Sequence, residues 1–338
     1  MRRARDESTA MRAVAIREPG PEDVLTVVTR DALVPPAGHV RVRVRFAGVN
    51  RADLLQRIGV YPAPAGVPAD IPGLEYAGQI DAVGPGVSES KVGERVFGVT
   101  AGGAYAEQVV VHERETARIP DGISDRDAAA VPEAFITAYD ALVLQARLRP
   151  GERVLVHAVG SGVGTAGLQI AKALGCQVVG TSRTASKLER ARGLGLDAAA
   201  LVETPSALEK SVRDAFPHDV DVVLDLVGGA YFARTMPLLA TKARVVVVGL
   251  TSGTQSELDL GLLLRRRIAV TGTVLRARPL EEKIQAADVL RRTLSPWLTR
   301  GMIKPVVEQV FPLDKAADAH RLLAENATFG KVLLEVRS

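Results

Sequence analysis

The sequence predicts an α/β protein in which a doubly wound parallel sheet is inserted into a second, β-rich domain. Strand-like segments fill the first third of the chain, and strand-like character returns at its end. From about residue 124, short apolar runs alternate with amphipathic helices, which is typical of parallel βαβ units. Because the two ends resemble each other, we assign residues 11–133 and 277–338 to one domain and residues 134–276 to the inserted one. We expect residues 1–10 to be a disordered extension.

The β-rich part is identified by alternation and by turn residues. Residues 40–46 read Val-Arg-Val-Arg-Val-Arg-Phe, the period of a half-buried strand. Further strands are expected at 74–83, 95–99 and 104–111, separated by turns such as Gly84-Pro85-Gly86. The chain closes with a strand at 331–336.

The inserted part begins with a long helix over residues 125–146, which we expect to be kinked at Pro132. Strand-like apolar runs follow at 153–157, 177–181, 220–226, 243–249 and 268–275. Helices at 163–175, 184–194, 206–215 and 229–239 fill the intervals between them.

Composition excludes several classes of function. The chain has 338 residues, and none of its apolar runs approaches the roughly 20 residues needed to cross a bilayer. The net charge is only +4 and aromatic residues are 4%, so we expect no nucleic-acid partner. The arginine-rich start does not resemble a secretory signal, which favours the cytoplasm. Cys176 is the single cysteine and the five histidines are scattered, so we expect no metal site.

Residues 162–167 spell G-x-G-x-x-G between a predicted strand and a predicted helix. Glycines permit a tight turn and let backbone N–H groups approach a pyrophosphate, while the helix N-terminus adds partial positive charge. The loop therefore predicts a dinucleotide site, with a glycine-rich turn that binds nothing as the alternative. We assign cofactor contacts to Gly160, Ser161, Gly162, Val163 and Gly164.

The end of the next predicted strand indicates which dinucleotide binds. A carboxylate about 20 residues beyond the first glycine would bind the ribose 2′-hydroxyl of NAD. This chain instead has Ser182, Arg183, Thr184 and, further on, Lys187. Two cations and two hydroxyls suit a 2′-phosphate, so the sequence favours NADPH. The alternative is a solvated helix start in which Thr184 only caps the helix.

Five stretches together resemble the zinc-free quinone oxidoreductases of the medium-chain dehydrogenase/reductase superfamily, the zeta-crystallin-like group. The likeness is strongest to the tumour-suppressor-inducible quinone oxidoreductase branch and covers nearly all of residues 11–336. The stretches are residues 50–61, 72–78, 129–139, 157–164 and 330–334. The resemblance implies a GroES-like β-barrel catalytic domain plus a doubly wound Rossmann domain, an active site in the cleft between them, and a homodimer formed through Rossmann edge strands.

The resemblance also implies roles for individual residues. Asn50 would face the nicotinamide and Tyr61 would donate a hydrogen bond to the substrate, both as catalytic residues. An N-cap for Asn50 and a packed loop aromatic for Tyr61 are the alternatives. Thr137 would contact the cofactor, with helix-interior structure as its alternative. Further cofactor contacts are implied for Gly228, Val248, Gly249, Leu250, Leu275 and Lys331.

Two departures from relatives bear on function. Where zinc-containing relatives read Gly-His-Glu, this chain reads Gly73-Leu74-Glu75, which argues against alcohol dehydrogenase chemistry. Many relatives carry a tyrosine near Val202, so Arg183 would carry more of the NADPH preference here.

The sequence predicts zinc-free hydride transfer from NADPH to a quinone or a related activated carbonyl compound. Reduction of an enone or enoyl thioester, and a non-enzymatic NADPH-binding role, remain alternatives. A thioester carrier would favour a basic patch, for which residues 265–267 are a candidate, with a solvated helix end as the alternative.

Overall fold

The computed structural model describes residues 10–336 and divides into two compact units. Unit 1 contains the chain up to Glu133, Arg276–Gly301 and the chain from Pro305 onward; unit 2 contains Ala134–Leu275 and Met302–Lys304. Two short stretches differ from the predicted division. The Arg276 side chain is hydrogen-bonded within unit 1, and the backbone of Lys304 is held by the Gln169 side chain of unit 2.

The predicted extension lies outside the described residues except for Ala10. Ala10 was expected to be disordered, but it is the first residue of β1 and pairs with Asp31 of β2. Pairing with β2 extends the strand by one residue beyond Met11.

Unit 1 is built on a seven-stranded sheet and a separate two-stranded one. The large sheet has the order β14-β15-β3-β4-β5-β7, with β6 also paired to β3, and β1 pairs with β2. Its apolar core joins the inward residues of β3, such as Val40, Val42 and Val44, to β1, β4 and β15. The elements are β1 (Ala10–Ile16), β2 (Leu25–Asp31), β3 (His39–Val49), α1 (Arg51–Arg57), β4 (Glu75–Val83), β5 (Arg95–Val99), β6 (Gln108–His112), β7 (Ala117–Arg118), α2 (Asp125–Ala129), α9 (Leu280–Val289), α10 (Ser295–Thr299), β14 (Val307–Pro312), α11 (Ala316–Ala324) and β15 (Lys331–Glu335).

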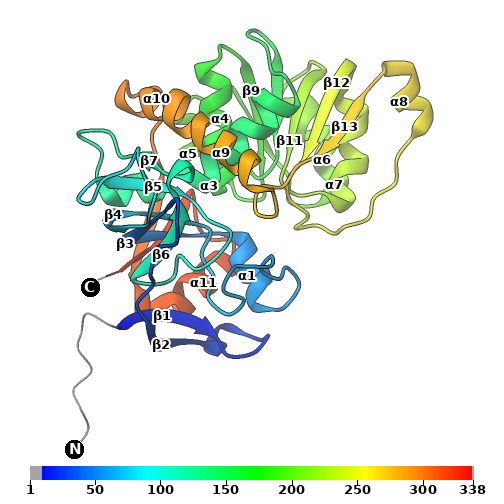
Figure 1. The fold of residues 1–338 in the computed structure, drawn as a ribbon. Coiled ribbons are helices and arrows are strands. Elements are labelled where there is room, and N and C mark those ends of the chain that lie inside the picture. The colour runs from blue at the N-terminus through cyan, green and yellow to red at the C-terminus, as the bar shows by residue number, and fades with distance from the viewer. Residues whose placement is uncertain (1–9, 337–338) are drawn as a thin grey trace, which may run out of the picture. The chain divides into compact units, whose positions relative to one another are not determined.

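Unit 2 is a six-stranded sheet with helices packed along it (Figure 1). All its neighbouring strands are parallel, in the order β10-β9-β8-β11-β12-β13. The α/β, doubly wound prediction is therefore confirmed. The elements are β8 (Arg153–Val156), α4 (Gly162–Ala173), β9 (Gln177–Ser182), α5 (Ala185–Arg192), β10 (Ala198–Leu201), α6 (Leu208–Ala215), β11 (Val220–Asp225), α7 (Gly229–Thr235), β12 (Leu239–Val247), α8 (Leu260–Arg266) and β13 (Ala269–Gly272). Helix α3 (Pro132–Tyr139) starts at the boundary of the units.

The strand order creates a switch point between β8 and β11. These strands are neighbours, but the chain leaves β8 toward β9 on one side and β11 toward β12 on the other. In open α/β sheets, ligands bind at the carboxyl ends of the strands at such a point. The loops that follow β9, β8, β11 and β12 lie at four adjacent positions of this edge.

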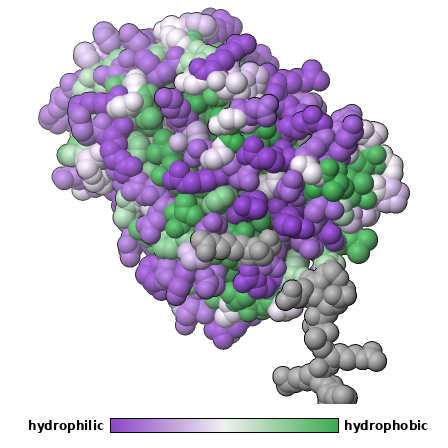
Figure 2. All heavy atoms as spheres, turned by 90° about the vertical axis from the view of Figure 1, so that its left-hand side faces the viewer, coloured by the Kyte–Doolittle hydropathy of each residue, from purple (hydrophilic) through white to green (hydrophobic). Residues whose placement is uncertain are grey.

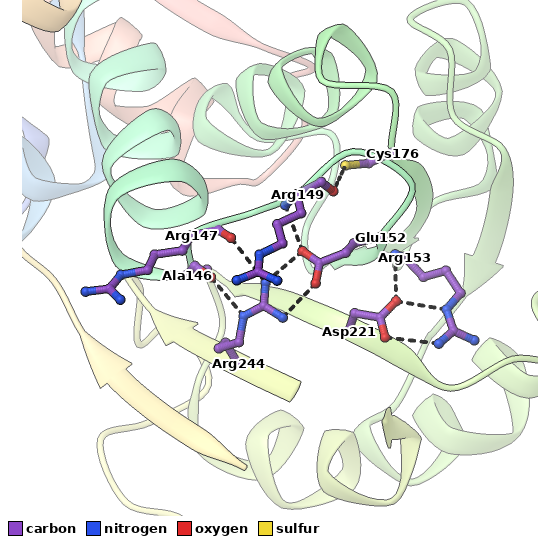
Figure 3. A network of polar contacts seen from close by, with 8 residues as sticks. All are labelled: Ala146, Arg147, Arg149, Glu152, Arg153, Cys176, Asp221 and Arg244. Atoms are coloured by element: carbon purple, nitrogen blue, oxygen red, sulfur yellow. Dashed lines mark hydrogen bonds and ion pairs between the residues drawn. The ribbon is translucent and has the colours of Figure 1, made fainter. Parts of the chain in front are cut away.

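Arginine–carboxylate pairs close the opposite, amino end of the same sheet (Figure 3). The Arg244 guanidinium binds both oxygens of Glu152, at 2.8 and 2.7 Å, and donates to the Ala146 carbonyl at 2.8 Å. Arg153 binds both oxygens of Asp221, at 2.9 and 3.0 Å. The two pairs connect the starts of β8 and β11 and the middle of β12 to the segment before β8.

Two secondary-structure predictions were wrong in part, and strand β10 was missed. The helix expected over 125–146 is broken rather than kinked: α2 ends at Ala129, and Pro132 is the first residue of α3. A residue before proline avoids helical dihedral angles, and proline suits a helix start. The strand expected at 104–111 begins only at Gln108. Strand β10, which was not predicted, reads Ala-Ala-Ala-Leu, a composition that does not favour strands.

No helix among residues 10–336 is long and apolar enough to cross a membrane. The face shown in Figure 2 is mostly hydrophilic, and its apolar side chains appear in separate groups.

Candidate functional site

The glycine loop after β8 is shaped by close packing. A Cβ at Gly164 would lie 2.4 Å from the Ala158 carbonyl oxygen, and a Cβ at Gly167 would lie 2.5 Å from Leu224 of β11. Neither position accepts a side chain without movement of the neighbour. Gly164 keeps the turn tight, and Gly167 lets α4 lie directly against the sheet. These are the roles that a dinucleotide-binding loop gives to its glycines.

Ser161 is the N-cap of α4, and its hydroxyl accepts the Gly164 N–H at 3.0 Å. The N–H groups of Gly162 and Val163 belong to the first turn, where a helix offers no internal partner. They therefore remain available to an anion at the positive end of the helix dipole. The loop fits the pyrophosphate of a dinucleotide.

The segment after β9 presents hydroxyls and cations. Ser182 ends β9, and its hydroxyl accepts the Thr184 N–H at 3.1 Å. Thr184 occupies the N-cap of α5, but its side chain makes no capping hydrogen bond, so the capping alternative is not what the structure shows. Arg183 is exposed. No carboxylate lies at the end of β9 itself, where an NAD site would place one.

The loops after β11 and β12 pack tightly against each other. Asp225 accepts the N–H groups of Val227 at 2.9 Å and Gly228 at 2.8 Å through one carboxylate oxygen. A Cβ at Gly228, whose φ is +63°, would lie 2.7 Å from the Leu250 side chain. A Cβ at Gly249 would likewise lie 2.5 Å from the Leu226 carbonyl oxygen. Val248 and Leu250 flank this contact, and Leu250 is exposed.

Unit 1 contains a buried ion pair beside Asn50. The Lys331 ammonium lies 2.6 Å from Glu75, with side chains 5% and 0% exposed. The Asn50 amide lies between them: its Nδ2 donates to Glu75 at 2.9 Å, and its oxygen accepts from Lys331. Lys331 also donates to the Val49 carbonyl. All three ammonium donors thus have protein partners, and the contact of Lys331 with cofactor phosphates stays a prediction.

A second buried chain of hydrogen bonds supports α1. Asp53 accepts the Asn50 N–H at 2.8 Å, the Gly73 N–H at 3.0 Å and the Tyr105 hydroxyl at 3.2 Å. Burial raises the pKa of Asp53 to about 6 against the lowering effect of these bonds. Asn50 is the N-cap residue of α1, so its capping alternative and its place in the site coexist.

His320 continues this chain. Its Nε2 lies 3.1 Å from the Tyr105 hydroxyl and its Nδ1 lies 3.4 Å from Arg57. Since Arg57 can only donate and Tyr105 donates to Asp53, His320 fits as the neutral tautomer with hydrogen on Nε2. Burial lowers the pKa of His320 to about 3, and the Arg57 charge adds to this. This chain of hydrogen bonds positions α1. The His320 imidazole in it stays neutral near neutral pH.

Tyr61 lies beside Arg276. The guanidinium is 5.1 Å from the ring centroid, and it also donates to the Tyr61 carbonyl at 3.1 Å and to Gln56 at 2.5 Å. The Tyr61 hydroxyl has no hydrogen-bond partner among residues 10–336. Burial raises the pKa of Tyr61, so the phenol stays protonated near neutral pH and can donate a hydrogen bond.

The structure brings most of the predicted residues together within each unit. In unit 2 the four loops that carry them share one sheet edge, and Thr137 and Leu275 are buried elsewhere in that unit. In unit 1 Asn50 and Lys331 are in contact. Sequence reasoning missed the polar partners in unit 1, although a charged residue inside an apolar strand run was a signal for Glu75. The residues missed are Asp53, Glu75, Tyr105, Glu133, Arg276 and His320.

A zinc ion does not fit these residues. Among residues 10–336, no group of three or more His, Cys, Asp or Glu side chains is arranged to hold a metal ion. The carboxylates of Asp53 and Glu75 are taken by backbone N–H groups, Tyr105, Asn50 and Lys331.

Two family models match the chain. One, described as an alcohol dehydrogenase GroES-like domain, matches residues 36–121, and one described as a zinc-binding dehydrogenase matches residues 162–291. A synaptic vesicle membrane protein VAT-1 homolog from Rattus norvegicus is 33% identical over 96% of this chain and 84% of its own length. The chain belongs to the medium-chain dehydrogenase/reductase superfamily. The predicted pairing of a GroES-like domain with a Rossmann domain is confirmed.

Some relatives are much larger than this chain. Among the solved relatives, one is described as NAD-dependent and another is complexed with NADPH. Polyketide synthase GfsB from Streptomyces halstedii is 36% identical over 96% of this chain, which spans only 6% of that protein. Solved relatives include an NAD-dependent alcohol dehydrogenase (33% identity, TM-score 0.86, 96% of this chain and 100% of that one), a mycobacterial protein complexed with NADPH (28%, 0.87, 96% and 99%) and the CurK enoyl reductase (27%, 0.84, 97% and 99%). The chain spans 6% and 16% of the two polyketide synthases it matches, and an NAD(P)-dependent oxidoreductase activity is proposed for it below.

Proposed function

We propose that the protein is an NADPH-dependent, zinc-independent reductase of quinones or related activated carbonyl compounds, in the quinone oxidoreductase branch of its superfamily. The observation that carries the proposal is the Tyr61 phenol, which is protonated, has no protein partner among residues 10–336 and lies beside the Arg276 cation. A hydrogen-bond donor next to a positive charge stabilises an oxyanion as it forms. It cannot replace a metal that ionises an alcohol, so an electron-poor acceptor suits this site.

The cofactor would be held by unit 2. The first-turn N–H groups of Gly162 and Val163 would bind the pyrophosphate, and Ser182, Arg183 and Lys187 would bind the 2′-phosphate of NADPH. Gly228 and the segment 248–250 would line the path of the cofactor. When bound, NADPH supplies a hydride. The side chains of unit 1 would orient the acceptor and stabilise its developing charge.

Reduction of an enone or enoyl thioester is the second candidate. The likeness to the CurK enoyl reductase and to polyketide synthases favours it. Within unit 2, Arg266 of the basic segment 265–267 is occupied by the Pro237 carbonyl, so this segment gives little support to a carrier-docking patch.

A direct test follows oxidation of NADPH and of NADH by absorbance with 1,4-benzoquinone, 9,10-phenanthrenequinone, a simple enone and crotonyl-CoA. We expect turnover with quinones that prefers NADPH and is unaffected by a metal chelator, and a loss of kcat in Tyr61→Phe. Turnover confined to crotonyl-CoA would replace the proposal by the enoyl reductase. A preference for NADH would overturn the role of Arg183.

We also propose that two copies of the chain pair through β13. This strand lies at the edge of the unit 2 sheet, and all four of its residues are exposed, Val270 by 40%. An unpaired edge with an apolar residue is a template for strand pairing. Light scattering after gel filtration should give twice the mass of one chain, and a charged Val270→Arg variant should give the single mass. A wild-type protein with the single mass would contradict the pairing.

A further inference from the structure

Three carboxyl groups gather in unit 1, and two of them are fully engaged. Asp53 accepts three hydrogen bonds. Glu75 accepts from Lys331 at 2.6 Å, from the Asn50 amide at 2.9 Å and from the backbone N–H of Glu133 at 2.8 Å. These contacts occupy both oxygens of each carboxyl group, so neither group is available to an acceptor.

The third carboxyl, that of Glu133, is held in place but not bonded. The bond of its backbone N–H to Glu75 fixes its position in the first turn of α3. Its side-chain carboxyl has no hydrogen-bond or ion-pair partner among residues 10–336. The residue is half-buried, so solvent can still reach it. Glu133 thus has a fixed backbone position and a carboxyl group to which no described protein atom is hydrogen-bonded.

Every charge around Glu133 can be named. Burial is the largest cause that raises its pKa, to about 8, and the charges of Glu75 and Asp53 add to the rise. Lys331 and Arg276 oppose it. The charge of Glu133 in turn adds to the raised pKa of the Tyr61 phenol. Glu133 therefore carries its proton at neutral pH.

We propose that Glu133 is the proton donor of the reaction, an inference that rests on the proposed reductase function. The acceptor gains a hydride with its electron pair from NADPH, which leaves NADP⁺. It gains one proton from the Glu133 carboxyl, whose O–H bond breaks as the acceptor's O–H bond forms. A quinone becomes a hydroquinone, and an enone reduced at its β-carbon becomes an enol that returns to the ketone. Glu133 then recovers a proton from water.

The neighbouring donors suit this step less well. The Lys331 ammonium is buried against Glu75 and Asn50, and loss of its proton would leave Glu75 as an unpaired buried charge. Burial raises the pKa of the Tyr61 phenol further above that of a carboxyl group, so it holds its proton more tightly than Glu133 does. Tyr61 would donate a hydrogen bond to the same oxygen while Glu133 supplies the proton.

The test compares the wild type with Glu133→Gln, which can donate a hydrogen bond but has no acid proton. General acid catalysis contributes about 10²-fold or more, so we expect kcat with 1,4-benzoquinone to fall about 10²-fold while the Kd for NADPH stays unchanged. The wild-type kcat should fall as pH rises through about 8, and this fall should be absent from the variant. Glu209→Gln, at a half-buried position on α6, is the matched control and should behave as the wild type.

Infrared difference spectra of the protein without cofactor give a readout independent of turnover. The wild type and Glu209→Gln should show a protonated-carboxyl band that disappears as pH rises through about 8, and Glu133→Gln should lack it. A Glu133→Gln enzyme with wild-type kcat and an unchanged pH profile would overturn the donor role alone, as would a band that survives the substitution. A wild type that turns over none of the acceptors would overturn the proposed function first.

Discussion

The two ends of the unit 2 sheet differ in the residues that form them: arginine–carboxylate pairs at one end and glycine-rich loops at the other. At the amino end, Arg244 and Arg153 each bind a carboxylate through two hydrogen bonds, and Cys176 donates to the Arg149 carbonyl (Figure 3). At the carboxyl end, the loops contain glycines whose Cβ positions are filled by neighbouring backbone, as at Gly164 and Gly249. One end satisfies its polar groups internally, and the other leaves N–H groups at a helix start.

The difference separates stability from function along the same strands. The Arg244–Glu152 pair is about one-quarter exposed and ties three elements together, which needs no ligand. The glycine loop has no side chains to stabilise it by packing. Its bare backbone can be approached closely, which is useful when a ligand must bind backbone N–H groups. Substitutions at the amino end should therefore change unfolding, and substitutions at the carboxyl end should change cofactor binding.

The largest effect is expected for Gly164→Ala. Its new Cβ would lie 2.4 Å from the Ala158 carbonyl oxygen, so the loop must shift away from its binding shape. Strain of a few kcal/mol corresponds to a loss of about 100-fold in NADPH affinity, measurable by fluorescence titration. Gly272→Ala is the matched control, because nothing lies within 4 Å of its Cβ position. Equal affinities for the two variants would contradict the role of the loop.

Arg244→Met should act on stability alone. It leaves the partly buried Glu152 without its cationic partner, with only the Arg149 N–H still donating to it, which costs about 1–3 kcal/mol of unfolding free energy. Urea denaturation should show the loss, and the Kd for NADPH measured below the transition should match that of the wild type. A large rise in Kd with unchanged stability would reverse our assignment of the two ends.

Arg183→Ala should reduce the preference for NADPH at the carboxyl end. Losing one charge-assisted contact to a 2′-phosphate should weaken NADPH binding about 10-fold and leave NADH binding unchanged. Titrations of both dinucleotides with both proteins measure the change in ratio. Parallel changes for NADPH and NADH would indicate that Arg183 does not distinguish them.

The smallest effect is expected in the pH dependence of stability at the amino end. Burial pushes the pKa of Asp221 upward, but its hydrogen bonds from Arg153 hold it below the ordinary value of 3.8. A depressed folded-state pKa adds stability above the unfolded value, and this stability is lost as pH falls through the folded value. The stability difference between wild type and Asp221→Asn should therefore shrink only below pH about 4. A difference that shrinks near neutral pH would exclude this origin.

The sequence predicted unit 2 better than unit 1 because its signals are local. The G-x-G-x-x-G loop and the residues after β9 are each read from one short stretch, and parallel order then places them on one edge. The unit 1 cluster depends on contacts between distant segments: Lys331 opens an apolar strand, Glu75 opens another, and only the sheet pairs them. The sequence identified Glu133 only as part of a family motif. That its carboxyl group lacks a hydrogen-bond partner among residues 10–336 can be learned only from the structure.

Hydrogen–deuterium exchange with and without NADPH tests the central distinction most directly. Bound NADPH should slow exchange at residues 160–165, 182–187 and 226–229 at the carboxyl end of the sheet. Exchange at residues 146–153 and at the start of β12 should not change. Protection at the amino end, or none at the glycine loop when NADPH is bound, would contradict the account.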